Sequence, residues 1–81
     1  MDWTLLINLI GWVGSAAVIA AYVLVSTNRL KGDSAAYQVL NLIGGVFLIV
    51  NTIYWGAFPS TVVNLVWVGI AIFAIARAIR K

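Results

Sequence analysis

The chain alternates long apolar runs with short polar segments, and this pattern predicts three membrane-spanning helices. No charged residue lies between Trp3 and Asn28 or between Ser34 and Ala76. A helix needs about 20 apolar residues to cross a hydrocarbon core of roughly 30 Å. The first charge-free stretch therefore has room for one span, and the second, about twice as long, has room for two.

Turn-forming residues set the expected helix boundaries. Residues 27–34 supply turn formers and charge, and Asp33 or Ser34 can cap the helix that follows. Gly56 suits a helix stop and Pro59 suits a first helical turn, so a tight connection is expected between the last two helices. The prediction is a single all-α transmembrane domain over residues 1–81, with helices at about 4–26, 35–55 and 59–76.

The composition agrees with a membrane protein. Of the 81 residues, 64% are hydrophobic and 9% are charged, which lies far outside the range of soluble globular domains. The first apolar run is longer than the core of a cleaved signal peptide, and no basic residue precedes it. We therefore expect it to remain in the protein as a span, with the lipid bilayer as the main partner.

The charges indicate an orientation. Three spans place the 27–34 loop on the same side as the carboxyl terminus, so all five basic residues face one compartment. The positive-inside rule makes that compartment the cytoplasm and puts the amino terminus outside. Because both basic clusters directly abut apolar spans, we interpret them as topology signals and expect no nucleic-acid partner. A bacterial inner membrane is the expected location.

The chemistry available to the chain is limited. It contains no cysteine and no histidine, and the expected spans contain no ionisable side chain. General acid–base catalysis and metal binding therefore lack their usual groups, and we expect no enzyme activity, cofactor or metal. A proton relay through the bilayer would also need ionisable groups. Any transported solute is accordingly expected to be small and neutral.

Uncharged polar residues in the second and third helices form the candidate binding site. Because the chain reverses between these helices, Asn51 and Asn64 are expected at similar depths, roughly 6 to 8 Å to the outer side of the helix midpoints. Trp67 shares a stripe of the third helix with Asn64, and an indole face beside an amide suits a sugar-like metabolite. Thr52 completes the candidate site. An alternative is that the asparagines only hold the helices together, as amides often do in membranes.

Glycines in the first two helices suggest close helix packing. Gly11, Gly14, Gly44 and Gly45 lie within the first two expected spans. Small residues at such positions let two helix backbones approach each other. We expect these glycines to serve packing and not to line a binding site.

Four short motifs stand out along the chain: I-G-W-V-G-S-A at residues 10–16, K-G-D-S at 31–34, Y-W-G-A-F-P at 54–59, and an asparagine five residues beyond Pro59. Together they resemble the motifs of the SemiSWEET proteins, which belong to the PQ-loop group of transporters. The resemblance implies a triple-helix bundle that pairs as a homodimer around a central path, with alternating access for sugars. It also implies that Asn64 contacts solute. Thr52 stands where the family has a tryptophan, and the family's Pro-Gln pair is absent from residues 22–26.

The sequence thus predicts a SemiSWEET-like homodimeric carrier for a small neutral solute. In this interpretation Asn64 forms hydrogen bonds with the solute, Trp67 stacks on it, and Asn51 and Thr52 complete the polar lining. Two alternatives remain. One is a pore-forming protein of the phage holin type, and the other is a structural or accessory membrane protein without transport activity.

Overall fold

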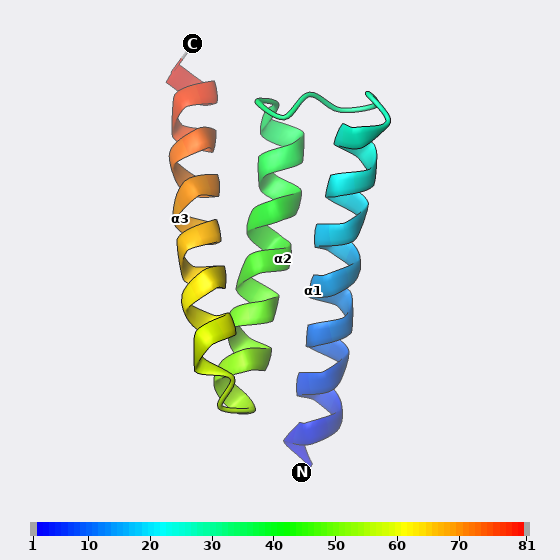
Figure 1. The fold of residues 1–81 in the computed structure, drawn as a ribbon, viewed down its shortest axis with the longest axis vertical. Helices are drawn as coiled ribbons and strands as arrows, with labels where there is room; N and C mark the ends of the chain where they lie inside the picture. The colour runs from blue at the N-terminus through cyan, green and yellow to red at the C-terminus, as the bar shows by residue number, and fades with distance from the viewer. Residues whose placement is uncertain (1, 81) are drawn as a thin grey trace.

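The structure, a computed structural model, describes residues 2–80 and contains three helices joined by two short connections (Figure 1). The helices run up, down and up, so that each is antiparallel to the next in the chain. All three are long and apolar enough to cross a membrane, which agrees with the predicted all-α membrane protein. They are α1 over Trp3–Ser26, α2 over Ala35–Tyr54 and α3 over Phe58–Arg80.

Local hydrogen bonds explain where α1 and α2 begin. The carboxylate of Asp2 accepts from the backbone N–H of Thr4 at 2.9 Å. The hydroxyl of Ser34 accepts from the N–H of Tyr37 at 3.2 Å. Each side chain satisfies one of the backbone donors that a first helical turn leaves free. Of the two predicted caps for α2, Ser34 is the one used.

The connection after α2 is tight because Gly56 adopts a positive φ of 71°. The N–H of Gly56 donates to the carbonyl of Ile53, and the N–H of Ala57 donates to that of Thr52. This pair of bonds satisfies carbonyls at the helix end and reverses the chain within three residues. The predicted glycine stop is confirmed, and α2 ends at Tyr54, one residue before the expected boundary.

Helix α3 differs more from the expectation. It begins at Phe58 and continues to Arg80, four residues past the predicted end at residue 76. The basic residues Arg77 and Arg80 therefore lie in its last turn and not in a separate tail, while Lys81 lies outside the described residues. Positive side chains at a helix C-terminus interact favourably with the free carbonyls there, so charge did not end this helix.

Helix α2 is the central element of the fold. It packs against both neighbours, whereas no Cα atom of α1 lies within 8 Å of one in α3. The molecule measures 44 × 22 × 22 Å and is as deep as it is wide. The three helices therefore do not form a flat row: α1 and α3 meet α2 from two directions and leave one side of α2 open between them.

Glycines bring α1 and α2 close together. A Cβ atom added at Gly14 would lie 2.9 Å from the carbonyl oxygen of Gly44 and 2.8 Å from the Cβ of Phe47. One added at Gly45 would lie 2.7 Å from Val68 of α3. The predicted role of the glycines in close helix packing is confirmed, and it is fulfilled within one chain.

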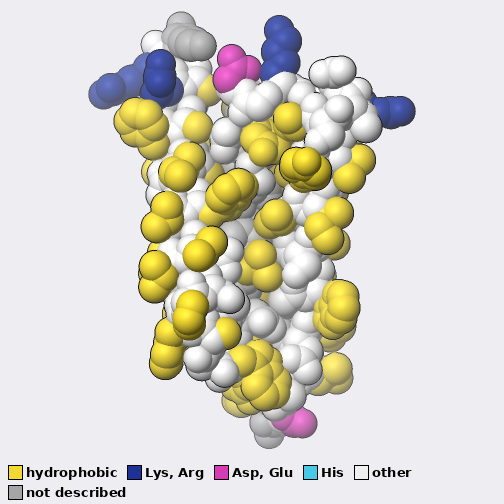
Figure 2. Space-filling model, in the orientation of Figure 1, with side chains coloured by type: hydrophobic (Ala, Val, Ile, Leu, Met, Phe, Trp, Pro, Cys, Tyr) yellow, Lys and Arg dark blue, Asp and Glu magenta, His cyan; other side chains and the backbone are white. Residues whose placement is uncertain are grey.

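Among residues 2–80, charged side chains occupy only the two ends of the molecule (Figure 2). The described basic residues all lie at the end that carries the 27–34 loop and the end of α3, and Asp2 lies at the other. Between these ends, large apolar side chains are exposed around the molecule. Such a surface is favourable only when it faces hydrocarbon or another apolar partner.

Candidate functional site

Polar contacts at the end of the molecule that carries Asp2 tie α1 to the end of α2. The indole Nε1 of Trp55 donates to Oδ1 of Asn8 at 3.0 Å, and the hydroxyls of Thr4 and Tyr54 lie 3.0 Å apart. Aromatic residues with a polar edge favour the level of the lipid headgroups. These contacts therefore fix the first two turns of α1 against the α2–α3 connection.

Asn51 extends this connection towards the middle of the helix bundle. Its Nδ2 donates to the backbone carbonyl of Ile7 in α1 at 2.9 Å. The amide lies directly over Gly11, where an added methyl group would collide with Nδ2. Asn51 therefore holds α1 and α2 together, and its Oδ1 remains as an acceptor.

Thr52, the next residue, connects α2 to α3 instead. Its hydroxyl donates to the carbonyl of Leu48 at 2.8 Å and accepts from the hydroxyl of Thr61 at the same distance. Thr61 is buried, with 7% of its surface exposed. Both of these hydroxyl groups therefore have partners inside the protein.

Asn64 lies apart from these two residues. It lines a shallow hollow of about 330 Å³ with three other residues of α3, namely Pro59, Ser60 and Val63. Its side chain makes no hydrogen bond within residues 2–80. It is thus available to a ligand, although the hollow is open and receives nothing from α2.

Trp67 lies beside a residue that was not among the candidate site residues, Asn41 of α2. The two share a cavity of about 200 Å³ between α2 and α3, which Tyr37, Gln38 and Ile70 complete. Asn41 falls four residues before Gly45 and therefore on the same face of α2, but the sequence alone does not decide which helix this face meets. That face packs on α3, because Gly45 meets Val68.

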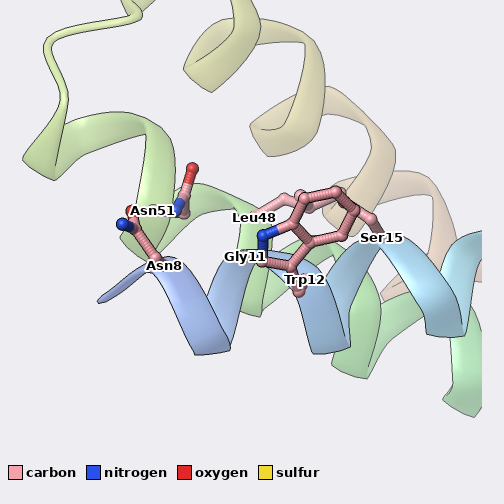
Figure 3. A pocket seen from close by; sticks show the side chains of 6 residues that line it. All are labelled: Asn8, Gly11, Trp12, Ser15, Leu48 and Asn51. Atoms are coloured by element: carbon pink, nitrogen blue, oxygen red, sulfur yellow. The ribbon is translucent and has the colours of Figure 1, made fainter. Parts of the chain in front are cut away.

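A further hollow of about 190 Å³ lies between α1 and α2 (Figure 3). The amides of Asn8 and Asn51 lie next to each other at one end, and the indole of Trp12 extends across the view towards Ser15. Trp12 has 76% of its surface exposed. This hollow is therefore a groove with an aromatic edge and not a closed pocket.

These hollows lie along the same side of the molecule. Leu48, which lines the α1–α2 hollow, is seven residues from Asn41, which lines the α2–α3 cavity, so both point to one side of α2. On α1 the polar residues Asn8 and Ser15 are likewise seven residues apart and border the same hollow. We call this side, between α1 and α3, the open side.

The structure thus separates the four predicted site residues. Asn51 faces α1, Thr52 faces α3, Asn64 lines a hollow on α3, and Trp67 lies with Asn41. The reason is geometric: successive residues of a helix point about 100° apart, so adjacent polar residues on α2 serve different neighbours. Within residues 2–80 no group of three metal-ligating side chains is present.

The comparisons with known proteins leave the function open. No curated protein and no solved structure matches the chain. A sequence model of one uncharacterised protein family matches residues 7–81, which is nearly the whole chain. The chain belongs to that family.

Proposed function

We propose that the protein is one half of a homodimeric carrier for a small neutral solute, acting by alternating access as SemiSWEET proteins do. The observation that carries the proposal is the open side. There, polar groups from all three helices border hollows at several depths, and no contact between α1 and α3 covers them. Ligand and ion sites of helical membrane proteins are built from such inward-facing groups at helix interfaces.

The absence of α1–α3 contact supports a second copy. A single chain would expose the amides and hydroxyls of its open side to lipid, where a polar group without a partner is costly. A second copy related by two-fold symmetry would present the same side and convert two grooves into one enclosed path. The site would then contain residues from both protomers.

The distribution of charge limits the solute. Every charged side chain of residues 2–80 lies at an end of the molecule, and the charge-free helices between these ends offer no counter-ion. A neutral solute that forms hydrogen bonds matches this environment. The positive end is placed in the cytoplasm of a bacterial cell, with the other end outside.

The predicted site residues take different roles in this proposal. Asn64 and Trp67 belong to α3, and neither side chain makes a hydrogen bond within residues 2–80. Both contact the solute in this proposal, as the SemiSWEET resemblance implies for Asn64. Asn51 and Thr52 join the helices that frame the path, and the Oδ1 of Asn51 remains available at its outer end. The asparagines thus combine a packing role with a binding role.

Flux through liposomes tests the proposal. Purified protein in sealed vesicles is expected to exchange labelled D-glucose or glycerol saturably while retaining an entrapped fluorescent dye. Empty vesicles serve as the control. Rapid dye release would favour a holin-like pore instead. A sealed membrane with no flux of any neutral solute would favour a structural or accessory protein.

A further inference from the structure

The cavity between α2 and α3 lies inside the expected membrane region. Asn41 is about 9 Å along a helix of about 30 Å, counted from the end at the 27–34 loop, and Trp67 lies near the middle of α3. The cavity contains about 200 Å³, which corresponds to about seven water molecules at roughly 30 Å³ each. It therefore suits a molecule between the sizes of glycerol and a monosaccharide.

Asn41 is the most unusual residue of this cavity. Only 4% of its surface is exposed, yet its amide makes no hydrogen bond within residues 2–80. No fully enclosed polar side-chain atom of the described residues lacks a partner. Because the amide atoms of Asn41 have no partner, they cannot be fully enclosed, and the small exposed part of the residue must include them. The space next to these atoms is the cavity that Asn41 lines.

An amide in this position needs a partner. A buried polar group without a hydrogen bond costs roughly 1 to 3 kcal/mol, and the other asparagine that reaches between helices, Asn51, has its bond. The other polar side chains that line the cavity do not form a hydrogen bond with Asn41. Gln38 donates to the carbonyl of Gly32 at 3.0 Å and keeps its own oxygen free.

The lining indicates the class of ligand. An amide both donates and accepts hydrogen bonds, Gln38 and Tyr37 add polar groups towards the cytoplasmic end, and Trp67 supplies a flat apolar face. No charged side chain lines the cavity. Such a combination recognises a neutral molecule with hydroxyl or amide groups on one edge and an apolar face.

We infer that Asn41 and Trp67 form the central solute-binding subsite of this protein, with Asn41 as its hydrogen-bonding residue and a polyhydroxylated neutral molecule as its ligand. This inference rests on the proposed carrier function and goes beyond it, because it moves the site to the α2–α3 cavity. Asn64 then lies nearer the outer end of the same path.

Cysteine accessibility tests the subsite, since the chain has no cysteine of its own. The variants are Asn41→Cys and Ile43→Cys, which lie at nearly the same depth on α2. Ile43 is 45% exposed and belongs to the side of α2 that faces lipid. A thiol reacts as the thiolate, which forms in a wet cavity but not in hydrocarbon. With a water-soluble methanethiosulfonate, Asn41→Cys is expected to react about tenfold or more faster than Ile43→Cys.

The second part adds D-glucose and glycerol as probes in reconstituted vesicles. A probe that the parent protein transports is expected to slow the labelling of Asn41→Cys several-fold and to leave Ile43→Cys unchanged. Trp67→Cys repeats the measurement from α3, and circular dichroism with gel filtration establishes that each variant is folded.

The possible failures differ from one another. If Asn41→Cys reacts as slowly as Ile43→Cys, the cavity is dry and the inference is wrong. If a probe is transported but does not slow labelling at either cavity position, the inferred subsite is wrong, while the proposed carrier function is supported. Absence of flux for every probe overturns the proposed function and the inference with it.

Discussion

Asn51 and Thr52 are adjacent in the sequence but join α2 to different helices. The amide of Asn51 is bonded to α1 and the hydroxyl of Thr52 to α3. Asn64, in contrast, has no partner in the described residues and lines an open hollow. The uncharged polar residues of the helices therefore fall into two groups. Some hold the helices together, and others are available to a ligand.

The first prediction follows from this division. Asn51→Ala is expected to lower the free energy of unfolding by about 1 kcal/mol, because the bond to the carbonyl of Ile7 is lost. Asn64→Ala is the matched control and should change stability much less. Thermal unfolding in detergent, followed by circular dichroism, measures both. Equal losses for the two variants would contradict the division.

Helix length and position were largely predictable from the sequence. Charge-free runs bounded by Asp2, the 27–34 loop and the Gly56–Pro59 turn leave few alternatives for three spans. The end of α3 was not predictable in this way, because alanines and arginines are good helix formers and continue the last turn beyond the apolar run. Charged residues limit the length of an apolar span, but they do not end the helix that contains it.

The sequence did not predict which face of each helix packs against which neighbour. Gly44 packs on α1 and Gly45 on α3, and no local feature of the sequence decides which glycine meets which neighbour. The candidate site depends on this choice, since Asn41 follows the face of Gly45 and so comes to lie beside Trp67. The sequence named Asn51, Thr52, Asn64 and Trp67 as candidates, but not the pairing of Trp67 with Asn41 that the structure shows.

The second prediction concerns this packing. Gly14→Ala is expected to destabilise the α1–α2 pair by about 1 to 3 kcal/mol, because the added methyl group meets the backbone of Gly44 and the helices must move apart. Gly69 is the control, since an added Cβ would have no neighbour within 4 Å. Gly69→Ala should be neutral or stabilising by up to about 1 kcal/mol through helix propensity. Denaturation in mixed micelles distinguishes the two, and similar losses would show that Gly14 is not a contact point.

At the scale of the whole molecule, the charges predict the orientation. Alkaline phosphatase fused after Lys81 is expected to be inactive, and a green fluorescent protein at the same position to be fluorescent, because the positive-inside rule assigns the basic end to the cytoplasm. Fusions in the 27–34 loop, which lies at the same end, should behave alike. High phosphatase activity at either position would reverse the assignment.

The last prediction concerns the dimer. If two copies join through their open sides, Ser15→Cys lies near the interface and is expected to form a disulfide-linked dimer under mild oxidation in native membranes. Val46→Cys, on the far side of α2, should remain monomeric at the same depth. Cross-linking of Val46→Cys alone would place the interface on the wrong face, and a ladder of higher species would exclude a closed pair.

The central position of α2 also has a consequence for synthesis. Every helix contact in the structure joins elements that are consecutive in the chain, since α1 and α3 do not meet. The α1–α2 hairpin is thus able to form as soon as α2 has left the translocon, and α3 then adds to an existing surface without displacing anything. Folds built from contacts between neighbouring segments assemble rapidly. Each helix of a nascent chain can therefore pack as soon as the helix that follows it in the sequence has been made.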